Sequence, residues 1–400
     1  MAPGARGLRK KIEAERRSSR WSPPYSPWME AGGDWLLYGA NGYTGRLILE
    51  EATIRGHRPV LAGRNPDRLR PLAERARLPW VACDLDDAAG LDRALADVQL
   101  VVHAAGPFVE TSEPMIAACL RAGVSYLDIS GEIPVFERAL ARHEEALERG
   151  VLVMPGVGFD VVPLDCLAAY VVGQLQEPRE LELAHFSTSG ASRGTVLSAL
   201  GILQEGGKVR RGGRLESRPF GRGGKTIRMW RGEGHGTLRR LRAIPAPMPE
   251  LVAAWKTTGV ENITTYLTLP RHRAWPVELF GPSLPGVLGH HAVSEHLRRR
   301  VERSELRPKN DHRAQAWARA RNERGALAEA WLDLPEPYSF TASSAVRAVE
   351  ACFALRPKGV KTPAGAFGED LVLRVPSVER HFESGAARRW EPARDGCSNR

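Results

Sequence analysis

The sequence predicts an α/β fold in which the first half of the chain forms a doubly wound parallel sheet. Between residues 34 and 160, short apolar runs alternate with segments of helical character. The runs are nearly continuous, as in parallel strands that helices cover on both faces. The strands are expected in "WLLYGA", "RPVLAG", "PWVACD", "LVVHAAG", "SYLDIS" and "VLVMPG", and the helices at 45–56, 66–76, 87–97, 111–122 and 134–149.

The pattern changes after about residue 170. A strand "ELELAHFST", a helix "GTVLSALGILQEGG", glycine- and arginine-rich strands and turns, and a strand "ENITTYLTLP" predict a second, antiparallel layer. Residues 313–335 alternate on both sides of the turn "NERG", which predicts a hairpin. Residues 341–355 have helical period, and Thr341 is the expected N-cap.

Length and composition place the chain among soluble globular proteins of two or three domains. It has 400 residues, 42% of them hydrophobic. The sequence contains no run of eighteen apolar residues, so no membrane span is predicted. Residues 1–33 lack the apolar region of a secretory signal, so we expect a disordered extension there and a disordered tail at 383–400. The 5 cysteines have no metal or redox spacing, which indicates reduced thiols and the cytoplasm.

The net charge of +10 is carried mostly by arginine, and much of it lies at 207–242. Only Phe220 and Trp230 are interleaved there, and no nucleic-acid motif is present, so we expect no nucleic-acid binding. Two interpretations stay open, a solvated basic face and a surface for an acidic partner.

The stretch "LLYGANGYTGRLILEE" places glycines between a strand and a helix. Gly39 permits a tight turn, Gly42 allows backbone to approach a pyrophosphate, and Gly45 lets the helix lie close to the strand. The helix N-terminus then attracts the phosphates. The spacing is G-x-x-G-x-x-G rather than the commoner G-x-G-x-x-G. The residues assigned to cofactor binding here are Gly39, Asn41, Gly42, Tyr43, Thr44 and Gly45.

The end of the second strand indicates which dinucleotide binds. A cofactor without a 2′-phosphate is usually held by an acidic residue about twenty residues after the glycines, whereas a 2′-phosphate calls for arginine. Here "PVLAGRNPDRL" offers Arg64, with Arg68 one turn later and no carboxylate in the decisive place. Arg64 can donate charged hydrogen bonds to the phosphate. The sequence therefore predicts NADP(H), although an ordinary surface arginine would look the same.

Two further strand ends belong to the same crevice. "ACDLDD" brings Asp84 and Leu85 to the expected adenine edge, although Asp84 would equally serve as the N-cap of the next helix. "VVHAAGPF" brings Ala105, Gly106 and Pro107 under the nicotinamide ribose.

The segments "GANGYTGR", "LAGRNPDRL", "AAGPF", "YLDISGE" and "PGVGFDVVPLD" follow one another in this order. Together they resemble the NADP-binding domain of the saccharopine dehydrogenase-like oxidoreductases, and within that group the trans-acting enoyl reductases of bacterial lipid and polyketide synthesis. The resemblance is close over about 34–170 and returns near the C-terminus. It implies a Rossmann-type domain at 34–165, an inserted α+β substrate domain at 166–338, and a segment at 339–382 whose helix packs back on the first domain.

Short-chain dehydrogenase chemistry is excluded, because none of the 7 tyrosines has a lysine four positions later. Reduction of C=C or C=N needs positioning, an anion-stabilising donor and a proton source. Asp128, Ser130 and Glu132 in "YLDISGE" are candidates, unless Asp128 merely caps the next helix. For Asp160 and Asp165 two interpretations are open as well: they face the crevice, or they cap the helix around 163–173. Our assigned catalytic residues are Asp128, Ser130 and Asp160.

The second half offers weaker candidates. Ser192, Arg193 and Thr195 stand at an expected helix N-terminus, which suits a carboxylate, a thioester oxygen or a phosphate but also an ordinary cap. Three histidines at 290, 291 and 296 lack cysteine or carboxylate at ligand spacing, so we expect a surface helix and no metal.

The sequence thus favours an NADPH-dependent reductase of an activated C=C in a lipid or polyketide intermediate. The resemblance allows a small-molecule or carrier-bound acyl substrate, an acidic carrier protein and a homodimer. Two alternatives stay open. One is imine reduction or amine oxidation on an amino-acid-like substrate, and the other is a non-catalytic NADP(H) sensor or scaffold.

Overall fold

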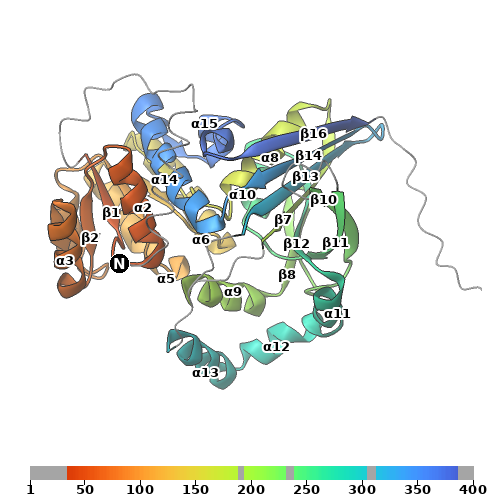
Figure 1. Ribbon diagram of the computed structural model, residues 1–400, viewed down its shortest axis with the longest axis horizontal. Coiled ribbons are helices and arrows are strands. Elements are labelled where there is room, and N and C mark those ends of the chain that lie inside the picture. The colour runs from red at the N-terminus through yellow and green to blue at the C-terminus, as the bar shows by residue number, and fades with distance from the viewer. Residues whose placement is uncertain (1–33, 188–192, 231–237, 304–311, 386–400) are drawn as a thin grey trace, which may run out of the picture.

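Two β-sheets organise the chain, and helices lie between them (Figure 1). The computed structural model describes residues 34–187, 193–230, 238–303 and 312–385. The expected extension at 1–33 lies outside these ranges, as do residues 386–400 of the expected tail.

The first sheet has 7 strands, all paired in parallel, which confirms the predicted doubly wound class. Its order is β15 (Gly359–Val360), β6 (Leu152–Met154), β5 (Ser125–Asp128), β4 (Leu100–His103), β1 (Trp35–Tyr38), β2 (Val60–Gly63) and β3 (Trp80–Ala82). The strand order reverses between β1 and β4. In sheets of this kind, ligands bind at that switch point, outside the carboxyl ends of the strands.

Helices cover both faces of this sheet because its central strands, such as β1 and β4, are buried along their whole length. Leu37 of β1 packs in the same cluster as Ile48, whereas its neighbour Leu36 packs in the cluster of Met115. The helices are α2 (Tyr43–Ile54), α3 (Pro66–Ala76), α4 (Ala88–Leu95), α5 (Phe108–Ala122), α6 (Ile133–Ala141) and α7 (His143–Glu148). Where the sequence predicted a single helix at 134–149, the structure has two helices, α6 and α7.

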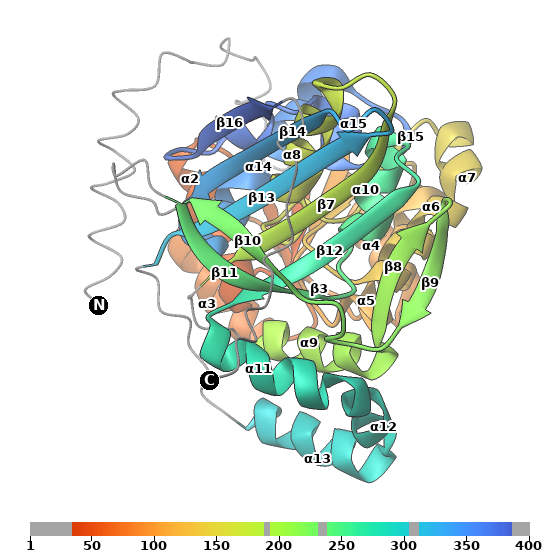
Figure 2. The ribbon, with the colours of Figure 1, turned by 90° about the vertical axis from the view of Figure 1, so that its right-hand side faces the viewer.

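The second sheet has 9 strands (Figure 2). Seven follow one another in the order β10, β11, β12, β7, β13, β14 and β16, while β8 pairs with β12 and with β9. They are β7 (Pro178–Phe186), β8 (Gly207–Arg211), β9 (Arg214–Arg218), β10 (Lys225–Trp230), β11 (Leu238–Pro245), β12 (Asn262–Leu269), β13 (Ala314–Asn322), β14 (Leu327–Leu334) and β16 (Glu379–Gly385). The predicted hairpin at 313–335 is confirmed by the antiparallel pairing of β13 with β14. The expectation of a wholly antiparallel layer is wrong, since β12 crosses over to pair in parallel with β7.

One face of the second sheet is covered by α8 (Val162–Gly173), which packs on β13, β14 and β7, and by α10 (Glu250–Thr258). Helices α9 (Arg193–Glu205), α11 (Arg271–Phe280), α12 (Leu284–Gly289) and α13 (His291–Glu302), with the turn η2 (Gly281–Ser283), lie together along one edge of the molecule (Figure 2). None of the helices in the described ranges has the length and hydropathy needed to cross a bilayer.

The C-terminal segment contributes to both sheets. Helix α14 (Pro337–Leu355) packs on α2, β15 extends the first sheet, and β16 continues to Gly385 as the edge strand beside β14. The ordered strand thus runs three residues into the tail expected from 383. The short helices α15 (Pro363–Phe367) and η3 (Val372–Arg374) connect them. The expectation that Thr341 caps α14 is wrong: Glu336 accepts the backbone N–H groups of Tyr338 and Ser339.

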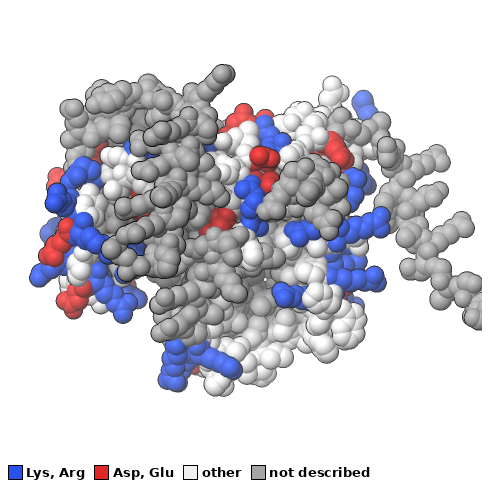
Figure 3. Space-filling model, viewed as in Figure 1, with Lys and Arg blue, Asp and Glu red and all other residues white. Residues whose placement is uncertain are grey.

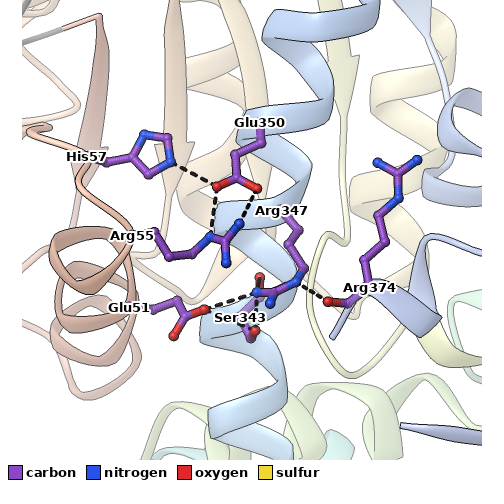
Figure 4. Close-up of polar contacts among 7 residues, drawn as sticks. All are labelled: Glu51, Arg55, His57, Ser343, Arg347, Glu350 and Arg374. Carbon is purple, nitrogen blue, oxygen red and sulfur yellow. Dashed lines mark hydrogen bonds and ion pairs between the residues drawn. The ribbon is translucent and has the colours of Figure 1, made fainter. Parts of the chain in front are cut away.

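Ion pairs join α14 to the first domain (Figure 4). The Arg347 guanidinium donates to the Glu51 carboxylate over 3.0 Å, and both side chains are buried. Arg55 holds Glu350 with two hydrogen bonds of 2.8 Å, and His57 lies 3.2 Å from the same carboxylate. These contacts fix the C-terminal helix against α2, the helix that follows the glycine loop.

Candidate functional site

The turn between β1 and α2 can be built only with glycine at two positions. Gly39 has φ +84°, and a Cβ there would lie 2.9 Å from the Cβ of Ala105. A Cβ on Gly45 would lie 2.2 Å from the carbonyl oxygen of Gly39, which is backbone and cannot swing away. The first turn of α2 therefore lies directly against the end of β1.

The N-terminus of α2 is open to an anion. Its N-cap is Gly42, which has no side-chain capping bond, and the first turn contains no acidic residue. The first N–H groups of a helix have no partner within the helix. They and the helix dipole favour a phosphate at this point. The turn fits a dinucleotide pyrophosphate.

The other residues assigned to the loop lie around this opening. The backbone carbonyl of Asn41 accepts from Arg46, and Thr44 is partly exposed in the first turn of α2. Tyr43 is 38% exposed and meets Tyr338 of α14 edge to face, with ring centroids 5.0 Å apart. The C-terminal helix thus borders the mouth of the predicted cofactor site.

Arg64 follows β2 directly, and its side chain is exposed. Within the described ranges it has no hydrogen-bond or ion-pair partner. The next residue, Asn65, caps α3 by accepting the N–H of Arg68 over 3.2 Å. An unpaired guanidinium beside a helix start, with no carboxylate at the strand end, fits the 2′-phosphate of NADP(H).

The remaining predicted cofactor residues follow β3 and β4. Asp84 is exposed, and Leu85 packs beside the core. The alternative that Asp84 caps α4 is wrong, since Asp87 accepts the N–H of Gly90 over 2.9 Å in that role. Ala105, Gly106 and Pro107 lie between β4 and α5, next to Gly39. These strand ends meet at the switch point, as the sequence predicts.

A cavity of about 390 Å³ opens between the first domain and the helices of the second. Its wall combines the turns after β4 and β5 with α9 and α13. Most lining side chains are apolar, and Arg298 is the one cation among the described lining residues. They are Pro107, Val109, Glu110, Glu132, Ile133, Pro134, Leu197, Ser198, Leu200, Gly201, Gln204, Pro247, Ser294 and Arg298.

A polar bridge crosses the cavity wall. The Ser198 hydroxyl of α9 donates to Glu132 Oε1 over 2.7 Å. The other carboxylate oxygen accepts the backbone N–H of Gly131 over 2.8 Å. Glu132 is only 4% exposed, so this bond ties α9 to the turn that follows β5. The lining residues Ser198, Gln204, Ser294 and Arg298 were not among the sequence candidates.

Asp128 is enclosed, with 0% of its surface exposed. It accepts four hydrogen bonds, from the Tyr126 hydroxyl, the Ser130 hydroxyl, and the backbone N–H groups of Ser130 and Gly156. Burial raises its pKa to about 6, against the lowering effect of these donors. It does not cap α6, whose N-cap makes no side-chain bond. Asp128 and Ser130 therefore hold the ends of β5 and β6 together and do not line the cavity.

Asp160 has the opposite environment. It is exposed, and no described group forms a hydrogen bond with it. Its surroundings nevertheless raise its pKa to about 6, through desolvation and then the Glu132 carboxylate. The side chain is thus reached by solvent and yet closely surrounded by protein, which is compatible with a raised pKa. Asp160 is not among the cavity-lining residues, but it lies beside Gly131, next to the lining residue Glu132.

Asp165 neither faces the crevice nor caps α8, whose N-cap Val161 makes no side-chain bond. It is fully buried and accepts from the Thr257 hydroxyl at 2.5 Å and the Ala364 N–H at 2.8 Å. Helix α9 does begin at Arg193, but Ser192 and the side chains of Arg193 and Thr195 lie outside the described residues. In the described part of the chain, no group of histidine, cysteine and acidic residues could hold a metal.

Part of the arginine-rich segment 207–242 makes contacts within the fold. Arg210 stacks on the Trp255 ring at 4.1 Å, and Arg242 pairs with Glu278 at 2.7 Å. Arg228 pairs with Glu329 at 3.2 Å. These arginines bridge strands and helices of the second domain. The other arginines at 214, 218, 222 and 240 are exposed, so a solvated face and a partner surface both stay predictions for this segment.

Comparison with known proteins shows what the N-terminal part of the described chain is similar to. Residues 35–154 match the saccharopine dehydrogenase NADP binding domain. The chain is 31% identical over 160 residues to a mouse saccharopine dehydrogenase-like oxidoreductase, covering 35% of this chain and 37% of that protein. It is 30% identical over 176 residues to a trans-acting enoyl reductase of Mycobacterium ulcerans, covering 40% and 42%.

The match thus spans little more than a third of the length of these relatives. The whole fold is similar to a saccharopine dehydrogenase (L-Glu forming) from Saccharomyces cerevisiae solved without ligand, with a TM-score of 0.59 and 12% identity over 88% of this chain and 100% of that one. The predicted cofactor is confirmed by the domain match. Residues 35–154 are thus similar to the NADP-binding domain of the saccharopine dehydrogenases.

Proposed function

We propose that this protein is an NADPH-dependent reductase that acts on an activated C=C in an apolar acyl intermediate. The proposal rests on one observation, the apolar cavity that begins at Pro107 beside the predicted nicotinamide position. We also propose that residues 166–338 form the substrate domain. Some relatives that match the chain are named enoyl reductases, which supports this choice.

NADPH, when bound, supplies a hydride to the substrate. The chain must then position the acceptor carbon, stabilise the developing negative charge and deliver a proton. Ser198 carries a hydroxyl on the cavity wall, already oriented by Glu132. Asp160, with its pKa raised to about 6, holds a proton in a useful fraction of molecules near neutral pH. We assign proton delivery to Asp160. Because the Ser198 hydroxyl donates its one proton to Glu132, we assign to its oxygen the orientation of the substrate, as a hydrogen-bond acceptor.

The lining chemistry favours an acyl chain over a dicarboxylic amino acid. Two carboxylates would need two cationic partners, and the described lining supplies only Arg298. That arginine already lies 3.4 Å from Glu110, and its exposed position suits the phosphate of a thioester carrier arm better than an internal carboxylate. We also propose that the substrate is a thioester bound to an acidic carrier protein. We further propose that the enzyme is a homodimer and acts in the cytoplasm.

The test is NADPH oxidation, followed by absorbance, with enoyl thioesters of increasing chain length. Gly201 lines the cavity, and a Cβ there would meet nothing within 4 Å. Gly201→Phe should therefore fold normally, fill part of the cavity and reduce turnover of long chains at least tenfold more than of short ones. Gly201→Ala is the matched control, with little effect.

Two results would reject the proposal. Turnover of cyclic imines but not of enoyl thioesters would identify an amine-forming enzyme. Tight NADPH binding without oxidation by any substrate would identify a sensor or scaffold.

A further inference from the structure

Helices α11, α12 and α13 expose an unusual number of large apolar side chains. Of the eleven such exposed side chains in the described residues, five lie between positions 275 and 293. They are Trp275 at 64%, Leu279 at 54%, Phe280 at 60%, Val287 at 51% and Val293 at 38% exposure. Apolar clusters of this kind on a surface usually mark an interaction site.

The apolar side chains are concentrated on α11. Trp275 and Leu279 are four positions apart and share one face of the helix, and Phe280 follows at its end. The one buried residue of α11 is Ala274, so the large side chains point away from the protein. The three helices lie at the edge of the molecule, beyond both sheets (Figures 1 and 2). They form a projecting ridge, which we call the helical arm (271–303).

The helical arm is also basic. It contains six arginines and three glutamates and no lysine or aspartate. Glu278 is already paired with Arg242, and Glu295 with Arg299. Arg271 and Arg273, on either side of His272, are exposed and have no ion-pair partner within the described ranges. Figure 3 shows the mostly uncharged surface over α11 and α12 at the bottom of the molecule, with basic side chains beside it.

We propose that the helical arm docks on an anionic lipid surface. Tryptophan, phenylalanine and leucine on one face, with flanking arginines, are the composition of helices that lie in the bilayer interface. Unpaired arginines add attraction to acidic headgroups. A projecting ridge with excess positive charge suits a deformable anionic surface better than the same ridge of a second copy, which carries the same charge.

The helical arm also reaches the cavity. Ser294 and Arg298 of α13 line it, so docking brings the cavity wall close to the headgroups. This inference concerns where the protein binds, and it does not depend on which reaction the site performs.

The test is co-sedimentation of the full-length protein with vesicles of phosphatidylcholine, with and without phosphatidylglycerol. We expect binding to the mixed vesicles and a loss of about fivefold in affinity for each of Arg271→Gln and Arg273→Gln at low salt. Trp275→Glu should weaken binding by about tenfold or more. Leu355→Glu is the matched control, because Leu355 is 58% exposed at the end of α14, outside the arm.

Circular dichroism and NADPH binding of each variant establish that it is folded. The proposal is overturned if the wild type does not bind anionic vesicles, or if Leu355→Glu reduces binding as much as Trp275→Glu. It is equally overturned if Trp275→Glu abolishes self-association in light scattering while vesicle binding is absent, since the apolar ridge would then be a contact between copies of this chain.

Discussion

The bond between Glu350 and Arg55 should make a measurable part of the stability of this protein depend on pH. Both side chains are 20% exposed, and the carboxylate is held by two hydrogen bonds of 2.8 Å. The neighbouring His57 and Arg55 lower the pKa of Glu350 from 4.5 to about 2, although burial alone would raise it. Glu350→Gln keeps the shape of the side chain and resembles the protonated acid, so it removes this contribution.

The magnitude follows from the difference in pKa. A lowering of about 2.5 units corresponds to about 3.4 kcal/mol of folding free energy at pH 7. Because the pKa is lower in the folded state, this stabilisation is complete above pH 4.5 and is lost as the pH falls towards 2. At pH 3.5 about 2 kcal/mol should remain. Wild type and Glu350→Gln should therefore differ by about 3 kcal/mol at pH 7 and by roughly 1.4 kcal/mol less at pH 3.5.

Urea unfolding at both pH values, followed by tryptophan fluorescence, measures these differences. Glu323→Gln is the control, because Glu323 pairs with Arg179 on the surface, where the side chains are 72% and 53% exposed. Its change should stay under about 1 kcal/mol at either pH. Equal stability of wild type and Glu350→Gln at pH 7 would refute the reasoning. A difference that does not shrink at pH 3.5 would refute the assigned cause.

Three further predictions concern the site. Arg64→Ala should weaken NADPH binding roughly ten- to 150-fold and leave NADH binding unchanged, as fluorescence titration would show. Gly45→Ala places a Cβ 2.2 Å from the Gly39 oxygen, so α2 must move by roughly 1 Å, and titration should show about tenfold weaker binding of both cofactors. Since the pKa of Asp160 is raised to about 6, turnover should fall as the pH rises through 6 in the wild type, and Asp160→Asn should abolish this dependence.

The sequence predicts the cofactor turn well because its determinants are local. Gly39, Gly45 and Arg64 act within a few residues of the strands that precede them, and strand, turn and helix follow directly from the apolar pattern. The cavity could not be predicted in this way. Glu132 meets Ser198 across 66 positions, and no local pattern indicates which helix covers which strand end.

One signal for the cavity was nevertheless present in α9. Leu197, Gly201 and Gln204 are spaced four and three positions apart, so they lie on one face of the helix. An apolar, a small and a polar residue thus line the cavity from the same face. The failed prediction for Asp165 has the same origin as the missed cavity. A carboxylate near a helix start predicts a cap, but Thr257 and Ala364, which lie 92 and 199 positions away, bind it instead.

Asp128 and Asp160 show why a raised pKa alone does not identify a catalytic acid. The pKa of Asp128 is raised to about 6 by burial, and that of Asp160 to about 6 by desolvation from the surrounding protein and by the Glu132 carboxylate. Yet four donors surround Asp128, and none of the described groups forms a hydrogen bond with Asp160. Two of the four donors are backbone N–H groups, and that of Gly156 fixes the loop that leads to Asp160.

Asp128→Asn removes an acceptor from at least one buried donor, so it should lower the unfolding free energy by about 1 to 3 kcal/mol while the pH profile of turnover keeps its midpoint near 6. Asp160→Asn should do the reverse, abolishing that profile at little cost in stability, because its side chain is exposed and unbonded. Urea unfolding and pH–rate profiles of the two variants separate the roles. If Asp128→Asn removed the midpoint and Asp160→Asn kept it, the enclosed carboxylate would be the proton donor, which would require the loop at Gly156 to open during turnover.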